Sequence, residues 1–273
     1  MTRPFWLAAV ASMRTFAGSP GEPITRYVRY ERRGAIAFGI LDGDTVRELS
    51  ASPFDGGRPT DVQVAAGEVR LLAPCTPSKV IAVGLNYRSH LHDRPAPSSP
   101  GLFIKLPTSI IGPEEKIVFP PGARTVHYEG ELVVVIGRRA SRVSRADADA
   151  CIFGVTAGND VSEREWQKND LQWFRAKASD TFGPLGPAIV RGLDYNDLRI
   201  QTRLNGELRQ EARTSDLIFP IGEIVSYVSQ FVTLEPGDVI YTGTPGTTQA
   251  MKAGDVVEVE VEGVGVLRNR IAG

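Results

Sequence analysis

Two carboxylates lie two residues apart at the start of an apolar, β-branched run over residues 127–137 (HYEGELVVVIG). In a β-strand, residues i and i+2 project from the same face, so Glu129 and Glu131 are expected to lie side by side. Two anions this close repel each other unless a cation lies between them or one of them takes a proton. Because hard cations prefer oxygen ligands, the pair indicates a site for Mg²⁺, Mn²⁺ or Ca²⁺.

Asp160 is the candidate third oxygen ligand. It lies where a predicted strand over residues 152–157 gives way to a helix, and a side chain there can reach a site at the sheet edge. Three acids among the 32 acidic residues of the chain also fit an exposed edge strand. Asp160 could instead cap the helix, although Ser162 is better placed to do so. From the residues alone, a metal site and a set of surface acids therefore both stay open.

The bulk composition limits the function classes. With 273 residues, the chain can hold one large domain, or one domain and a small appendage. Its net charge of −1 provides no field that would attract nucleic acid, and the basic cluster over residues 138–145 is interpreted as a solvated turn. Two cysteines, Cys75 and Cys151, give neither a disulfide framework nor a cysteine-rich zinc site, which fits a reducing cytoplasm. No apolar run is long enough to span a membrane.

The chain is expected to divide into an N-terminal extension with a small β domain, residues 1–74, and a larger domain, residues 75–273. In the first part, strands are predicted over residues 24–30, 35–41 and 45–49. Residues 51–61, rich in Pro, Gly and Asp, are expected to be a loop. Residues 1–12 bear a weak likeness to a secretory signal, Met13 is an alternative start, and the role of residues 1–20 stays open.

Short strands with a few helices dominate the larger domain. The clearest hairpin spans residues 198–210, around the type I′ turn signal Asn205-Gly206. Apolar residues at helical spacing predict an amphipathic core helix over residues 220–232, and Ser144 and Ser162 are expected to open two short helices as N-caps. Further strands are predicted over residues 80–83, 102–104, 116–119, 152–157, 239–241 and 257–261. Because strands and helices do not alternate regularly, we expect a strand-dominated α+β fold, with a mixed β-roll or flattened pseudo-barrel, rather than a doubly wound sheet.

A series of short motifs carries a family resemblance. In chain order they are GLNY (84–87), His90, FIK (103–105), YEGE (128–131), GNDVS (158–162), QWFRAK (172–177), DTFGPLGP (180–187), NGE (205–207) and GDVIYTGTP (237–245). Over roughly residues 78–271 the chain closely resembles the fumarylacetoacetate hydrolase superfamily, including bacterial members labelled 2-hydroxyhepta-2,4-diene-1,7-dioate isomerase or acylpyruvate hydrolase. This order of motifs is highly specific for the family and poorly specific for the substrate.

The resemblance implies a fold, a cofactor and a set of site residues. Members have a mixed β-roll, usually form homodimers, and hold one Mg²⁺ or Mn²⁺ per chain through two glutamates and an aspartate. Their substrates are 2-oxo acids or the related enols. Carried over to this chain, the metal ligands would be Glu129, Glu131 and Asp160, with Lys177 beside the substrate oxygens, Thr244 on a substrate carboxylate, and His90 with Asp93 as an acid/base pair on a mobile lid. Lys105 would either assist in binding substrate or simply end a strand.

This arrangement is chemically coherent. A chelated divalent ion acts as a Lewis acid on a 2-oxo acid, and it would share with Lys177 the negative charge of an enolate. A histidine is suited to moving a proton near neutral pH, and a carboxylate on its other ring nitrogen would fix the tautomer. The two other histidines are interpreted without a catalytic role: His127 as a satisfied polar residue, and His92 as pointing away from His90.

Two segments depart from the family pattern. The family usually shows His-x-x-Glu followed by a helix, whereas here Asp93 follows His90 and the dense prolines over residues 95–100 forbid a regular helix. If Asp93 cannot reach His90, water activation would be weak, and isomerisation or decarboxylation would gain ground. The second departure is the loop 246–249 (GTTQ), which replaces a more usual Gly-Val-Gly type of sequence and could alter substrate fit.

The leading hypothesis is therefore a metal-dependent enzyme that hydrolyses a C–C bond in a dicarboxylic 2-oxo acid of the acylpyruvate type. The second is isomerisation or decarboxylation in the manner of 2-hydroxyhepta-2,4-diene-1,7-dioate isomerase, and the third is a small oxaloacetate decarboxylase. A rival from another class is a protein that binds the metal and the 2-oxo acid without turnover. The expected partner is a small-molecule 2-oxo acid, with neither nucleic acid nor membrane, in a cytoplasmic homodimer.

Overall fold

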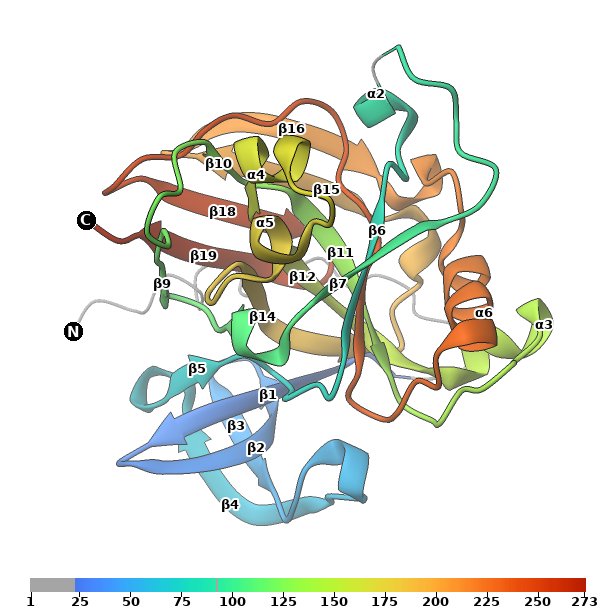
Figure 1. Ribbon diagram of the computed structural model, residues 1–273. Helices are drawn as coiled ribbons and strands as arrows, with labels where there is room; N and C mark the ends of the chain where they lie inside the picture. Colours follow the sequence, from blue (N-terminus) through green and yellow to red (C-terminus); the bar gives the residue numbers. More distant parts are fainter. Residues whose placement is uncertain (1–22, 92) are drawn as a thin grey trace.

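The computed structural model describes residues 23–91 and 93–273 (Figure 1). The expectations for residues 1–12, for Met13 and for His92 lie outside the described residues. Within the described part of the chain, no helix combines the length and the apolar character needed to cross a membrane.

Five antiparallel strands form the N-terminal unit: β1 (Thr25–Arg32), β2 (Ala35–Asp42), β3 (Thr45–Leu49), β4 (Pro59–Ala65) and β5 (Arg70–Leu72). The first three are confirmed to within two residues of the prediction. The loop predicted over residues 51–61 is wrong at its end, because β4 begins at Pro59. A proline is tolerated there because it is the first residue of a strand that lies at the edge of the sheet.

The rest of the chain supplies fourteen strands and five α-helices within the described residues. The strands are β6 (Val80–Gly84), β7 (Gly101–Lys105), β8 (Ile110–Ile111), β9 (Lys116–Ile117), β10 (Val126–His127), β11 (Gly130–Ile136), β12 (Ile152–Asn159), β13 (Ser162–Glu163), β14 (Gly183–Arg191), β15 (Arg199–Leu204), β16 (Glu207–Arg213), β17 (Val239–Tyr241), β18 (Val256–Val261) and β19 (Gly265–Ile271). The helices are α2 (Arg88–Leu91), α3 (Arg145–Ala148), α4 (Arg164–Asn169), α5 (Phe174–Ala178) and α6 (Ile221–Phe231), with 3-10 turns at Pro53–Asp55, Ala66–Glu68, Pro107–Ser109, Asp149–Cys151, Tyr195–Asp197 and Thr214–Asp216.

These strands form mixed, open sheets, so the expected strand-dominated α+β class is confirmed. The largest sheet has the order β4-β3-β2-β1-β14-β12-β11-β17-β6-β7, with β5 on β1 and β8 on β14. A second sheet has the order β16-β15-β18-β19-β9, and β10 pairs with β13. Most pairs are antiparallel, whereas β17 with β6, β14 with β8 and β19 with β9 are parallel.

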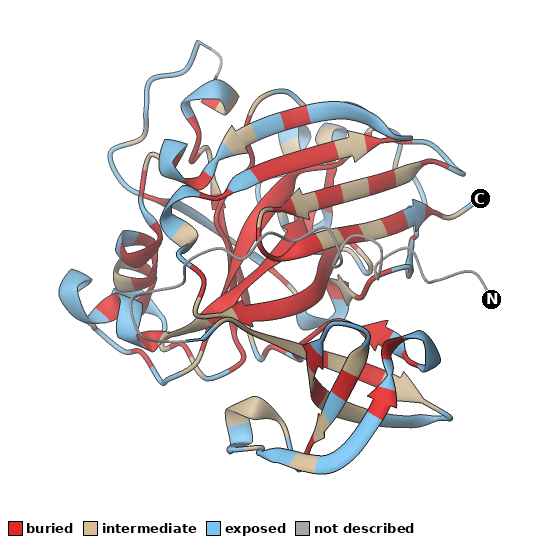
Figure 2. Cartoon of the chain, turned by 180° about the vertical axis from the view of Figure 1, so that it is seen from behind, coloured by how far each residue is buried: buried red, intermediate tan, exposed pale blue. Residues whose placement is uncertain are grey.

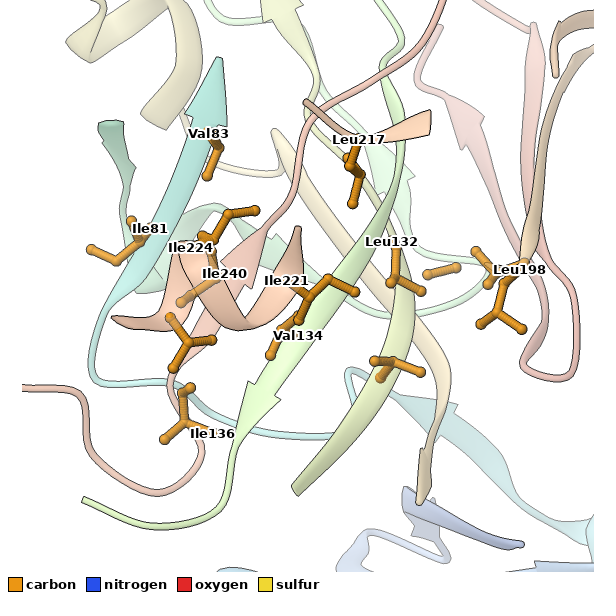
Figure 3. Close-up of a cluster of buried hydrophobic side chains, with 14 of the residues drawn as sticks. Ile81, Val83, Leu132, Val134, Ile136, Leu198, Leu217, Ile221, Ile224 and Ile240 are labelled. Carbon is orange, nitrogen blue, oxygen red and sulfur yellow. The ribbon is translucent and has the colours of Figure 1, made fainter. Parts of the chain in front are cut away.

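The core lies between the two larger sheets and beneath α6. Strand β11 is buried along its whole length, and its alternate residues enter two different clusters. Leu132, Val134 and Ile136 pack in the cluster that also holds Ile221 and Ile224 of α6 (Figure 3). Val133 and Val135 face the other cluster, so the apolar run 132–136 reflects a strand covered on both faces.

The N-terminal unit has a small core of its own, separate from the main one (Figure 2). Val28 and Tyr30 of β1 pack there with Leu41 and Val46, and Ala188 of β14 completes the cluster. Strand β1 also pairs directly with β14. The unit is therefore continuous with the large sheet, and the division at residue 74 stays a prediction.

Local signals in the larger part are confirmed in some places and wrong in others. Asn205 and Gly206 both have positive φ, 53° and 83°, as a type I′ turn requires. Ser144 caps α3 by accepting a hydrogen bond from the Asp147 N–H. The expected cap of α4 by Ser162 is wrong: the side chain of Glu163 accepts from the Trp166 N–H instead. The strand expected over residues 116–119 ends at Ile117.

Candidate metal centre and active site

Three buried carboxylates meet where β11 and β12 pair. Glu129 directly precedes β11, Glu131 is its second residue, and Asp160 follows β12. The antiparallel register places Gly130 opposite Asn159, and the Asp160 N–H donates to the Glu129 carbonyl oxygen at 2.8 Å. One carboxylate oxygen from each of the three acids lies within 4.8 Å of the others. Strand pairing thus brings the predicted ligands together.

The two glutamates differ in their electrostatic surroundings. Burial raises the pKa of Glu129, but the charges of Lys177, Arg164 and His90 outweigh it and hold that pKa well below its usual range. For Glu131, burial and the charges of Asp160 and Glu129 all act together to raise the pKa well above its usual range. Glu131 accepts a hydrogen bond from the Gly243 N–H at 2.7 Å. Among the described residues, no cationic side chain lies within ion-pair distance of Glu131.

The excess negative charge around Glu131 tests whether a metal ion fits this site. A buried carboxylate that faces two others needs a proton or a cation, and three oxygen donors within coordinating reach of one point suit a hard divalent ion. Glu129, Glu131 and Asp160 would hold that ion. The donor set fits Mg²⁺ and Mn²⁺ alike, so it leaves the choice between them open.

Two lysines neutralise the acids from different sides. The Lys177 Nζ, on α5, donates to Glu129 Oε2 at 2.6 Å and to Asp160 Oδ2 at 2.7 Å, and it lines the cavity. The Lys105 Nζ, at the end of β7, donates to Asp160 Oδ1 at 2.5 Å and to the Lys177 carbonyl oxygen. Lys105 is fully buried and is not among the residues that line the cavity. Lys105 thus ends a strand, as one of the two alternatives from the sequence had it, and we assign its ammonium to holding Asp160.

The carboxylates open into a cavity of about 660 Å³. Of the residues expected at the site, His90, Lys177 and Thr244 line it together with the three acids. The Thr244 hydroxyl donates to the Gly130 carbonyl oxygen at 3.0 Å and accepts from Gln210 Nε2 at 2.9 Å. Its contact with a substrate carboxylate stays a prediction.

His90 reaches the cavity from α2, at the start of the Pro-rich lid segment. Its Nδ1 lies 2.5 Å from the carbonyl oxygen of Gly246, and its Nε2 lies 4.0 Å from Glu129 Oε1. A carbonyl can only accept, so Nδ1 carries the proton and the neutral ring keeps a lone pair on Nε2. Burial lowers the pKa of His90, although Glu129 opposes this. Asp93 is exposed, and the backbone of Gly246 occupies the ring nitrogen that we expected Asp93 to hold.

Other cavity residues were not recognised from the sequence. Arg164, the first residue of α4, places its Nη2 2.5 Å from Glu129 Oε1 and donates through Nη1 to Gln167 Oε1 at 2.7 Å. A position four residues after Asp160, on the helix that follows the strand, is the signal that could have found it. Further cavity residues missed include Arg94, Phe103, His127, Gln167, Lys168, Trp173, Thr247 and Thr248.

His127 lines this cavity too, and its imidazole is neutral at physiological pH. Its Nδ1 lies 2.8 Å from Thr248 Oγ1. Burial and the charge of Arg164 lower the pKa of His127 to about 4, against the opposing effect of Glu129. The interpretation of His127 as a polar residue with a satisfied partner therefore omitted its place on the cavity wall.

Comparison with known proteins agrees with the family resemblance of the motifs. Residues 79–272 match the family model described as fumarylacetoacetate (FAA) hydrolase C-terminal, and residues 25–74 match one described as Rv2993c-like, N-terminal. The chain belongs to the fumarylacetoacetate hydrolase family.

Relatives within this family carry several different names. Protein Rv2993c of Mycobacterium tuberculosis is 45% identical over 249 residues, which cover 86% of this chain and 94% of the relative. A mitochondrial oxaloacetate tautomerase of Bos taurus, FAHD2B, is 43% identical over 75% of this chain and 70% of its own length. The crystal structure of 2-hydroxyhepta-2,4-diene-1,7-dioate isomerase from Mycobacterium marinum has 42% identity and a TM-score of 0.85, and it covers 91% of this chain and 98% of that one. Family membership is thus certain, and the reaction differs among the named relatives.

Proposed function

We propose that this chain is a divalent-metal-dependent isomerase that moves a proton between the keto and enol forms of a dicarboxylic 2-oxo acid, with oxaloacetate as the first candidate substrate. Relatives named oxaloacetate tautomerase and 2-hydroxyhepta-2,4-diene-1,7-dioate isomerase support this class of reaction. Both names describe a shift of a proton and a double bond next to a 2-oxo group. Such a reaction needs a base at the substrate carbon and stabilisation of an enolate, but no attacking water.

The observation that carries the proposal is the state of His90. Its Nδ1 donates to a backbone carbonyl, so the tautomer is fixed without Asp93 and the proton-accepting lone pair lies on Nε2. A lowered pKa favours the neutral ring, the form that can accept a proton. We therefore assign to His90 the removal of a proton from a bound 2-oxo acid and its return to the other end of the enolate.

The charges on the cavity wall favour a substrate with two carboxylates. Among the residues that the structure describes, four fixed cationic side chains line the cavity and outnumber the three carboxylates of the candidate metal centre. They are Arg94, Arg164, Lys168 and Lys177. A bound divalent ion would polarise the 2-oxo oxygen and add two more positive charges. A dianion balances this excess better than a monoanion does.

C–C bond hydrolysis of an acylpyruvate, the leading hypothesis from the sequence, is the second candidate. It needs a base strong enough to activate water, and the expected device is a His90–Asp93 pair. Asp93 lies three residues after His90 on an exposed, Pro-rich segment, so closure of that segment over substrate would have to bring the pair together. A homodimer and a cytoplasmic location also stay predictions.

The experiment follows the ultraviolet absorbance of enol-oxaloacetate in the presence of Mg²⁺ or Mn²⁺. We expect the protein to accelerate its decay to the keto form, and Glu131→Gln to lower the rate at least ~100-fold because it removes a metal ligand. Glu207→Gln, at the exposed first residue of β16, is the matched control and should leave the rate unchanged. Full activity after chelation, or in Glu131→Gln, would contradict the proposal. Release of pyruvate from acylpyruvates, with no effect on oxaloacetate, would favour the hydrolase.

A further inference from the structure

The loop over residues 246–249 contributes Thr247 and Thr248 to the lining of the candidate active site. Thr248 Oγ1 lies 2.8 Å from His127 Nδ1 and also 2.8 Å from Arg164 Nη2. Both partners line the cavity, and Arg164 also contacts Glu129 of the metal centre. One hydroxyl therefore connects β10, α4 and this loop at the cavity wall.

The chemistry of the three groups fixes the direction of one of the two hydrogen bonds. A guanidinium can only donate, so Thr248 Oγ1 accepts from Arg164. The second bond can run in either of two directions, because the Thr248 hydroxyl can donate its proton to His127 Nδ1 or accept from an Nδ1–H through its remaining lone pair. In the first case the ring proton of His127 lies on Nε2, and in the second it lies on Nδ1.

We propose that Thr248 is a positioning residue that holds His127 as the Nε2–H tautomer and Arg164 against Glu129, so that both present donors to the second carboxylate of the substrate. The assignment of the substrate group rests on the proposed function, whereas the hydrogen-bonded chain does not. His127 would then be a specificity-determining residue of the cavity. Thr248 would be the residue through which the loop 246–249 sets the orientation of His127.

A purely structural role for the Thr248 hydroxyl is less favoured, because the main chain already fastens this loop. The Met251 N–H donates to the Val126 carbonyl oxygen at 2.8 Å, and Ala250 forms a β-bridge with His127. At the other end, the Gly246 N–H donates to Ser89 Oγ at 3.0 Å. Replacement of the hydroxyl should therefore leave the loop in place and change mainly the orientation of the two donors.

The first test measures the His127 tautomer directly, by long-range ¹H–¹⁵N spectra of the full chain with Mg²⁺. The chain has three histidines, so the His127 signals are identified by their absence in His127→Asn. We expect the proton on Nε2 in the wild type and in Thr248→Ser, and a changed or mixed tautomer in Thr248→Val. Thr108→Val is the matched control, because its hydroxyl is exposed, lies outside the cavity lining and has no hydrogen-bond partner within the described part of the chain. A proton on Nδ1 in the wild type, or no change in Thr248→Val, would overturn the proposal.

The second test separates KM from kcat for oxaloacetate tautomerisation. Thr248→Val should raise KM about tenfold, with kcat within about threefold of the wild type, because donors to a non-reacting carboxylate contribute to binding. Thr248→Ser should restore KM. A loss confined to kcat, or a serine variant as impaired as the valine variant, would overturn the assignment to the second carboxylate. If the wild type does not turn over oxaloacetate, the proposed function fails, while the tautomer measurement still decides the role of Thr248.

Discussion

Gly130, between the two glutamates of the metal centre, shows how a residue without a side chain supports the site. A Cβ added at Gly130 would lie 1.9 Å from Thr202 Oγ1 on β15, and 3.2 Å from the Thr202 Cβ. The backbone of β11 can approach β15 this closely only because Gly130 carries a hydrogen atom where any other residue would carry a Cβ. Sequence analysis alone could not give this reason, because Thr202 is 72 residues away and belongs to the other sheet.

We expect Gly130→Ala to destabilise the protein by about 3 kcal/mol through overpacking. Thr202→Ala should cost about 1 kcal/mol, since its buried hydroxyl has no hydrogen-bond partner within the described residues and little more than one methyl group is lost. The double variant should be more stable than the sum of the two changes by at least ~1 kcal/mol, because removal of the hydroxyl relieves the closest contact. Urea unfolding of the four proteins measures this coupling, and strictly additive losses would contradict the packing explanation.

Site residues could be predicted from the sequence where their placement depends on geometry within a few residues of the chain. Glu129 and Glu131 can be paired because side chains of a strand alternate between two faces. Asp160 can be added because the end of a strand is a common place for a ligand. The partner of His90 could not be found in this way, because Gly246 lies 156 residues further along the chain and is brought there by the fold. The same holds for Arg164 and Thr248, whose contact depends on the path of an irregular loop.

At the element scale, Asp238 holds the start of β17 against the start of β6. The carboxylate accepts hydrogen bonds from the Ser78 and Lys79 N–H groups at 3.0 and 2.9 Å, and from the Glu235 N–H at 2.7 Å. Its ion-pair partner is the Lys79 ammonium, at 2.7 Å. Burial raises the pKa of Asp238, but these hydrogen bonds and the lysine outweigh burial, and the net shift is downward.

A carboxyl group whose pKa is lowered on folding stabilises the protein above its unfolded pKa, near 4, and this contribution is lost as the pH falls through the lower folded pKa. We therefore expect Asp238→Asn to lose about 2–3 kcal/mol at pH 7. The difference from the wild type should shrink only below about pH 4. Unfolding in urea, followed by tryptophan fluorescence across this pH range, measures it. Asp61→Asn, at an exposed position of β4, is the control and should change little. A difference that grew on acidification would contradict this account.

Elements with strong local signals could be placed from the sequence, and elements fixed by distant contacts could not. The Asn205-Gly206 hairpin and the amphipathic α6 have signals within a few residues, and both are confirmed. The cap of α4 differs, because Glu163 is buried and also accepts from the N–H groups of Arg124 and Thr125. A glutamate acting as an N-cap is uncommon, and its selection here follows from packing that no local motif encodes.

At the scale of the whole molecule, the N-terminal unit and the catalytic part share one sheet. β1 pairs with β14, whose other edge pairs with β12, the strand that leads to Asp160. Ala188 of β14 is also part of the small N-terminal core. A boundary at residue 74, predicted from the sequence pattern, marks a change in the order of predicted elements. Such a pattern cannot show that one sheet crosses the boundary.

This continuity predicts that the described fold unfolds in one cooperative transition. Val28 is fully buried in the N-terminal core, so Val28→Ala should cost about 2 kcal/mol and lower the Tm by about 4–8 °C. Because the two parts share a sheet, we expect a single calorimetric unfolding transition. This transition includes the part that carries the candidate metal centre, and it should shift as a whole to lower temperature. Val62→Ala, at a position that is 46% exposed on β4, is the matched control and should leave the Tm nearly unchanged. A small early transition in Val28→Ala, with the main transition unmoved, would show that the N-terminal unit folds independently despite the β1–β14 pairing.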